Sequence, residues 1–135
     1  MNRYIHVLLV SILMISCNQD NKYLPAKDPL VAGREFIDAS LKGKFEKADF
    51  FMLQDEENKR LLQKIAEQYS KVDNAKLKQL TESSIVIIDF TYVTEKETVI
   101  NYKYSFDGYV RKIKVIQQST GNWVVDFKYA NNGNL

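Results

Sequence analysis

The chain changes its hydrophobic period once, from helical spacing before residue 83 to alternation after it. Asp28 and Pro29 mark the first helix start, because aspartate caps free backbone N–H groups and proline suits the first helical position. Apolar or small residues then recur at helical spacing, at Leu30, Gly33, Ile37 and Leu41. Gly43 predicts the end of this helix, since glycine commonly follows the last helical turn.

Two more helices follow by the same criterion. A short helix is predicted over residues 44–52, and a longer one begins at the capping residue Asp55 and runs to about residue 71. The longer helix carries an apolar stripe made of Leu61, Leu62, Ile65 and Tyr69. Residues 74–80 have the spacing of one further helical turn.

The alternating part of the chain predicts four strands, because β-branched and aromatic residues dominate it. We place them at 85–94, 98–106, 109–118 and 123–129, with turns at residues 95–96, 107–108 and 120–122. Asp107-Gly108 is the clearest turn, since both residues tolerate the positive φ of a type I′ hairpin.

These elements predict a single α+β domain over residues 28–135. Three N-terminal helices are expected to pack on one face of a curved four-stranded antiparallel sheet. The sheet should be a meander, because every predicted connection between strands is short.

The first seventeen residues have a different character and predict a signal peptide at residues 1–16. Arg3 precedes an apolar run at 7–15, which is too short to span a bilayer alone. The segment Leu13-Met14-Ile15-Ser16-Cys17 resembles a bacterial lipobox, although Met14 stands where lipoboxes prefer leucine. The resemblance implies that Cys17 is acylated and that residues 1–16 are removed. An uncleaved membrane anchor and an ordinary secretory signal are the alternatives.

All three interpretations place the domain outside the cytoplasm. The lipoprotein interpretation makes Cys17 the membrane anchor and residues 17–27 an acylated tether that lets the domain stand away from the bilayer. Asn18 follows the cysteine, and by the same resemblance the absence of aspartate there favours the outer over the inner membrane of a Gram-negative cell.

Composition excludes several classes of function. Removal of the signal peptide leaves a net charge near +1 with interspersed signs, which is not the footprint of a nucleic-acid-binding protein. His6 is the only histidine and lies in the signal peptide, so histidine-based catalysis is excluded from the mature chain. Cys17 is the only cysteine. We therefore predict neither a metal site nor a cofactor.

Three segments carry a resemblance to a known family: Asp28-Pro29, the run from Phe36 to Ala48, and the closing Gly121-Asn-Trp-Val-Val-Asp-Phe127. Together they resemble the nuclear-transport-factor-2-like (cystatin-like) α+β cone, and more narrowly small bacterial lipoproteins with lumazine-binding-like domains. The resemblance implies a cone-shaped fold. Enzymes, ligand binders and partner-binding domains share such cones, so the resemblance does not choose among them.

Two sets of aromatic residues are candidate ligand contacts. Ile100, Tyr102, Tyr104 and Phe106 share one face of the second strand, and Trp123, Val125, Phe127 and Tyr129 share one face of the fourth. They either pack against the helices or line an apolar pocket edged with phenol hydroxyls. The candidate pocket residues are Ile100, Tyr102, Tyr104, Phe106, Trp123 and Phe127.

A catalytic alternative rests on Asp89. If it turns inward with Ile85 and Ile87, its carboxylate enters the cavity beside Tyr102 or Tyr104, an arrangement similar to that of ketosteroid isomerases. If instead Val86, Ile88, Phe90 and Tyr92 face the core, Asp89 is solvated, which is the commoner fate of a carboxylate.

The function expected from the sequence is a membrane-anchored, non-enzymatic binding module for a small amphiphilic ligand or an envelope protein. The first alternative is a small isomerase or dehydratase that uses Asp89 and a strand tyrosine. The second is an interaction factor whose cone is filled. The basic strand with Arg111, Lys112 and Lys114 is expected to be a solvated face of the sheet, and the alternative is a contact with an acidic partner or with lipid head groups. A homodimer through the sheet is also expected.

Overall fold

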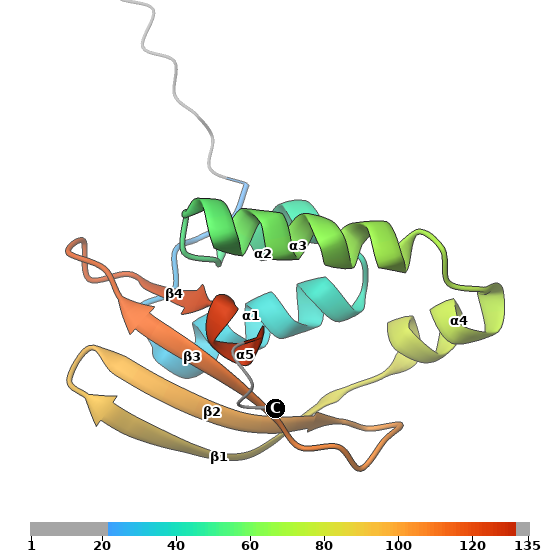
Figure 1. The fold of residues 1–135 in the computed structure, drawn as a ribbon. Coiled ribbons are helices and arrows are strands. Elements are labelled where there is room, and N and C mark those ends of the chain that lie inside the picture. The colour runs from blue at the N-terminus through green and yellow to red at the C-terminus, as the bar shows by residue number, and fades with distance from the viewer. Residues whose placement is uncertain (1–21, 132–135) are drawn as a thin grey trace, which may run out of the picture.

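The computed structural model describes residues 22–131, which form helices and one antiparallel sheet (Figure 1). The helices are α1 (Pro29–Leu41), α2 (Phe45–Phe50), α3 (Glu56–Tyr69), α4 (Asn74–Glu82) and α5 (Lys128–Asn131). The strands are β1 (Ile85–Thr94), β2 (Glu97–Tyr104), β3 (Arg111–Gln117) and β4 (Trp123–Asp126). The predicted α+β class and four-stranded antiparallel sheet are confirmed.

Capping aspartates set the helix starts, as the sequence predicted. The Asp28 carboxylate accepts hydrogen bonds from the backbone N–H groups of Leu30 (2.8 Å) and Val31 (3.2 Å), and α1 begins with Pro29. Asp55 caps α3 in the same way, by accepting from the N–H of Asn58 at 2.8 Å. Gly43 has a φ of 71°, a left-handed conformation that suits glycine and lets the chain leave α1.

Two elements differ from the prediction. Residues 74–82 form a complete helix, α4, because Asp73 caps it through the Lys76 N–H at 2.8 Å. The last strand was predicted to reach Tyr129, but β4 ends at Asp126 and α5 follows. The Lys128 N–H donates to Asn58 Oδ1 at 2.7 Å, so the backbone here hydrogen-bonds to α3 instead of continuing the ladder with β3. Helices α1 to α4 therefore precede the sheet in the sequence, and α5 follows it.

The strand order is β1-β2-β3-β4, and every neighbouring pair is antiparallel. The predicted turns at residues 95–96 and 120–122 are present, and Gly121 has the positive φ (82°) of its turn. The predicted tight hairpin at Asp107-Gly108 is wrong, because β2 ends at Tyr104 and β3 begins only at Arg111. The Asp107 carboxylate binds the Tyr109 N–H and the Arg111 guanidinium, which stabilises a wider loop.

The core lies between α1 and the inner face of β2, β3 and β4. Ile100, Ile113, Val115 and Val125 are all at most 1% exposed on that face. Gly33 of α1 sits against Ile100 and Val115, where the lack of a side chain lets the helix approach the sheet closely. Ala26, within the predicted tether, is 3% exposed and its carbonyl accepts from the Trp123 N–H at 2.9 Å. The chain is thus already packed on the domain before α1.

β1 is an edge strand whose large side chains are only partly covered. The exposed fractions of Val86, Ile88, Phe90, Tyr92 and Val93 lie between 40% and 58%. One alternative from the sequence buried Val86, Ile88, Phe90 and Tyr92 in the core. Their exposure contradicts that burial, because α1 covers β3 and β4 and reaches this edge only weakly. The homodimer expected through the sheet stays a prediction, which one chain alone does not test.

Candidate functional site

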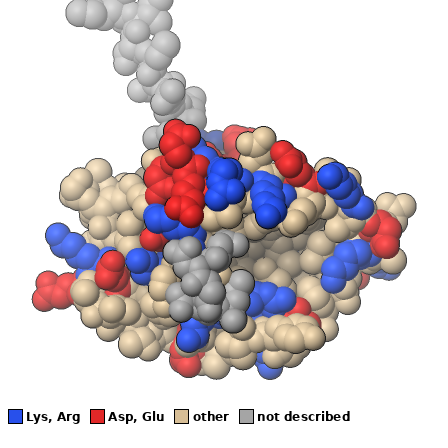
Figure 2. Space-filling model, viewed as in Figure 1, with Lys and Arg blue, Asp and Glu red and all other residues tan. Residues whose placement is uncertain are grey.

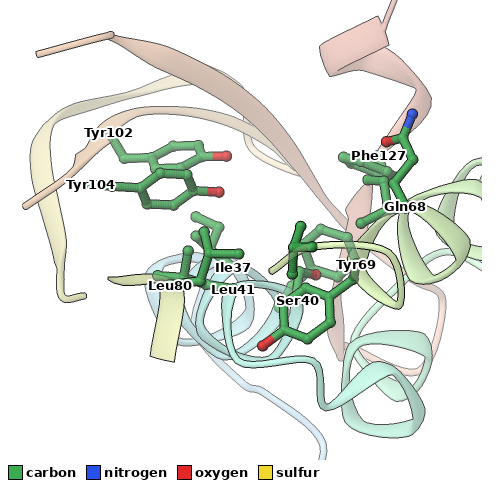
Figure 3. A pocket seen from close by; sticks show the side chains of 12 residues that line it. Ile37, Ser40, Leu41, Gln68, Tyr69, Leu80, Tyr102, Tyr104 and Phe127 are labelled. Carbon is green, nitrogen blue, oxygen red and sulfur yellow. The ribbon is translucent and has the colours of Figure 1, made fainter. Parts of the chain in front are cut away.

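A pocket of about 230 Å³ lies between the helices and β2 (Figure 3). It is enclosed by α1, α3 and β2, with single contributions from the α3–α4 connection, α4 and the residue after β4. Its lining consists of Phe36, Ile37, Ser40, Leu41, Ile65, Gln68, Tyr69, Val72, Leu80, Tyr102, Tyr104 and Phe127. None of these twelve side chains carries a formal charge at neutral pH.

Helical spacing explains the two helix walls. Ile37 and Leu41 stand one turn apart on α1, and Ile65 and Tyr69 stand one turn apart on α3, so each pair presents one face. Figure 1 shows that α3 stands off from β1 and β2, with α4 placed at the end of α3. α4 has no buried residue, and it contributes only Leu80 to the lining. At the α4 end, the pocket is therefore bounded by a helix that has no buried residue of its own.

Tyr102 and Tyr104 form the sheet wall. They point to the same face of β2, with ring centroids 5.8 Å apart, and Figure 3 shows both hydroxyls directed to the space bounded on its far side by Phe127 and Gln68. Burial raises the pKa of both phenols above the ordinary tyrosine value, although the Arg111 charge acts in the opposite direction on both. Both hydroxyls therefore stay protonated at neutral pH.

Charged groups lie behind this wall rather than in it. The Arg111 guanidinium is 4.1 Å from the centre of the Tyr104 ring and donates to both Asp107 carboxylate oxygens, at 2.9 and 2.8 Å. Phe106 stacks on Tyr104, and Lys76 of α4 lies 4.5 Å from the Phe106 ring centre. The contact between Lys76 and Phe106 attaches α4 to the turn that follows β2 by a cation–π interaction. Arg111 is already neutralised by Asp107 and so presents no unpaired charge to the pocket.

The Arg111 and Asp107 pair predicts a loss of stability in acid. Hydrogen bonds from Arg111, aided by the Tyr109 N–H, lower the pKa of Asp107 below its ordinary value of 3.8. A carboxyl with a depressed folded-state pKa contributes stability above the unfolded-state value and loses it as pH falls through the folded value. Urea unfolding measured from pH 7 to pH 2 should show this decline below about pH 4.

The matched variant for this prediction is Asp107→Asn. It should show a shallower acid decline than the wild type, though not a flat one, because the pKa of Asp55 is also lowered, chiefly by the Asn58 N–H. Parallel curves for the variant and the wild type would show that Asp107 does not carry the acid sensitivity.

Two hydroxyls at the pocket have no hydrogen-bond partner in the described part of the chain. They are Ser40 Oγ and Tyr69 OH, and both oxygen atoms are inaccessible to solvent. The Tyr69 ring packs on Phe45 (5.5 Å between centroids) and against Gly43, so its hydroxyl end is held at the α1–α2 turn. Ser40 lies on α1 between the lining residues Ile37 and Leu41. Unpaired buried hydroxyls are uncommon and call for a physical explanation.

The structure separates the residues proposed from the sequence into two groups. Tyr102, Tyr104 and Phe127 line the pocket, and Phe127 also packs on Phe36 with centroids 5.2 Å apart. Ile100 is fully buried beneath Gly33, Phe106 stands behind Tyr104, and Trp123 lies beside Ala26, so none of these three is part of the lining.

Sequence reasoning did not identify the helix-side lining. Ile65 and Tyr69 were recognised as an apolar stripe, but the pattern is the same for a helix that fills a core. Ser40 and Gln68 gave no signal, since isolated polar residues at helical positions usually face solvent.

Asp89 does not enter the pocket. The register of β1 on β2 shifts between Ile87, which pairs with Tyr102, and Asp89, which pairs with Asn101. Paired residues share a face and neighbours alternate, so Asp89 lies on the face opposite to Tyr102. Its side chain is exposed and accepts a hydrogen bond from Asn101 Nδ2. The carboxylate and phenol arrangement required by the isomerase hypothesis is not formed.

Other kinds of site find no support in residues 22–131. Nowhere in this range do three or more histidine, cysteine, aspartate or glutamate side chains gather where they could hold a metal ion. The helices of the same range include none with the length and apolar character needed to cross a membrane. Cys17 and the predicted signal peptide lie outside the described residues.

Comparison of the chain with protein-family models, curated proteins and solved structures finds no match. The resemblance to the cone-shaped family therefore stays a prediction, and the case for a function rests on the geometry of the pocket.

Proposed function

We propose that the chain is a membrane-tethered binding protein of the cell envelope, whose pocket holds a small amphiphilic ligand. The observation that supports this most is the pocket of about 230 Å³, which is lined by apolar side chains and a few hydroxyl groups. Ligand sites are typically concave and apolar, with a small number of polar groups that orient the ligand. A filled cone that acts only through its surface would leave no such space.

The membrane tether in this proposal is acylated Cys17. Its support is the lipobox-like sequence that ends at Cys17, together with the absence of any other cysteine in the chain. A single acyl chain binds a membrane only marginally, but the several chains of a bacterial lipoprotein would anchor the protein stably. The proposal also places the domain outside the cytoplasm and assigns it the cone-like form of an α+β fold.

We prefer a non-enzymatic function because the lining of the pocket contains no carboxylate, histidine or thiol. General acid–base catalysis needs a titratable group within reach of the bound molecule. The phenols of Tyr102 and Tyr104 have raised pKa values and so are suited to donating hydrogen bonds rather than to accepting protons. The pocket is thus better suited to holding a molecule than to converting it.

Native mass spectrometry tests the binding function. The full chain, purified gently from its own host, should retain a small molecule that is absent from the denatured protein. Ile65→Trp should abolish this retention, because Ile65 is half-buried in the lining and an indole would occupy the cavity. Gln63→Trp is the control, since Gln63 is exposed on the same helix. Retention by neither the wild type nor the control would reject the binding function.

A separate experiment tests the tether. Cells fed an alkyne analogue of palmitate should label the wild-type chain, and Cys17→Ser should remove all of the label. Labelling that survives the substitution would exclude Cys17 as the site of acylation. The two experiments are independent, because the pocket lies in the described domain and the cysteine lies outside it.

A further inference from the structure

We infer that the molecule bound in this pocket is uncharged and has about ten to twelve non-hydrogen atoms. The inference rests on the proposed binding function and narrows the class of ligand. Two features of the pocket support it, namely its lack of charge and its size.

The pocket offers no partner to a charged ligand. Its twelve lining residues include no aspartate, glutamate, lysine, arginine or histidine. The hollow visible below α3 in Figure 2 likewise shows a floor without lysine, arginine, aspartate or glutamate. The guanidinium nearest to the sheet wall belongs to Arg111, and both of its terminal nitrogens already bind Asp107. A carboxylate or ammonium buried here would lose its hydration without gaining a counter-ion.

The size of the pocket limits the ligand. An apolar cavity of about 150 Å³ accommodates benzene, which has six carbon atoms. The present pocket has about 230 Å³ and is open on one side, so it has room for a fused two-ring compound or a chain of similar size. A sterol or a complete phospholipid would not fit inside.

Three probes of one shape and different polarity test this inference. They are naphthalene, 2-naphthol and 2-naphthoate, and their binding is measured by fluorescence to the full chain in lipid nanodiscs, with empty nanodiscs as the blank. At pH 7 the neutral 2-naphthol should bind at least ten-fold more tightly than the charged 2-naphthoate. Naphthalene is also uncharged, and it should bind at least ten-fold more tightly than 2-naphthoate as well.

The remaining outcomes distinguish the ligand class from the proposed function. Binding of 2-naphthoate as tight as that of 2-naphthol, and sensitive to Ile65→Trp, would overturn the uncharged ligand and leave the pocket intact as a binding site. If none of the three probes binds the wild type better than it binds Ile65→Trp, the binding function itself is rejected, and the ligand class falls with it.

Discussion

Replacing Asn58 with leucine should lower the free energy of unfolding by about 3 kcal/mol. Asn58 is 0% exposed, and its side chain makes three hydrogen bonds. Its amide nitrogen donates to Asp55 at 3.0 Å and to Asp126 at 3.2 Å, and its oxygen accepts from the Lys128 N–H at 2.7 Å. Leucine has a similar volume but leaves all three partners without this contact. The packing is thus nearly preserved while the polar network is broken.

Urea denaturation of the variant and the wild type measures this loss. Gln63→Leu is the matched control, because Gln63 is an exposed amide on the same helix, and its substitution should change stability by no more than about 0.5 kcal/mol. A loss below about 1 kcal/mol for Asn58→Leu would show that water replaces the side chain as a partner. Equal losses for the two variants would show that the buried network is not the cause, because leucine does not weaken the helix at either position.

The Asn58 network also matters for the pocket. It joins the first turn of α3 to the end of β4 and the start of α5, so it fixes the helix that carries Ile65 and Tyr69 relative to the residue Phe127. The Lys128 ammonium adds contacts to Asp55 at 2.9 Å and Asp126 at 2.7 Å. Two pocket walls that are far apart in sequence are therefore held together by a fully paired polar cluster, which needs no ligand of its own.

The parts of the fold that depend on neighbouring residues were predictable from the sequence. Asp28 and Asp55 cap helices through N–H groups two or three residues away, and β1 occupies residues 85–94 as predicted. The errors arise where side chains distant in sequence or in a loop compete. Asp107 binds Arg111 instead of forming a tight hairpin, and the contact of Lys128 with Asn58 lies beyond the end of β4. Alternation along one strand carries no information on such contacts.

The candidate site shows the same limit. Alternation placed Ile100, Tyr102 and Tyr104 on one face of β2, and the structure agrees that all three point inward. It did not show which part of that face α1 covers, so buried Ile100 and the pocket residues Tyr102 and Tyr104 had the same signature. The irregular register between Ile87 and Asp89 places Asp89 on the outer face. No residue type in β1 predicts this shift from the sequence.

The close approach of α1 to the sheet gives the second large prediction, for Gly33→Ala. A Cβ at Gly33 would lie 2.5 Å from Ile100 Cδ1, a distance that requires movement in the fully buried core. Alanine gains about 1 kcal/mol of helix propensity, but overpacking of a dense core costs up to about 3 kcal/mol. The net effect should be a loss of about 2 kcal/mol in the free energy of unfolding.

Ile100→Val makes this prediction specific, because valine lacks the Cδ1 atom that meets the new methyl group. Alone, the substitution should cost about 1 kcal/mol by leaving a small cavity. In the Gly33→Ala background it should instead be neutral or stabilising, so the double variant should be more stable than additivity predicts by at least about 1 kcal/mol. Urea unfolding of the wild type, the two single variants and the double variant gives the four free energies of unfolding that this comparison needs. Additive losses would mean that α1 and β2 do not meet at Gly33 and Ile100, and the position of the α1 wall of the pocket would then be wrong as well.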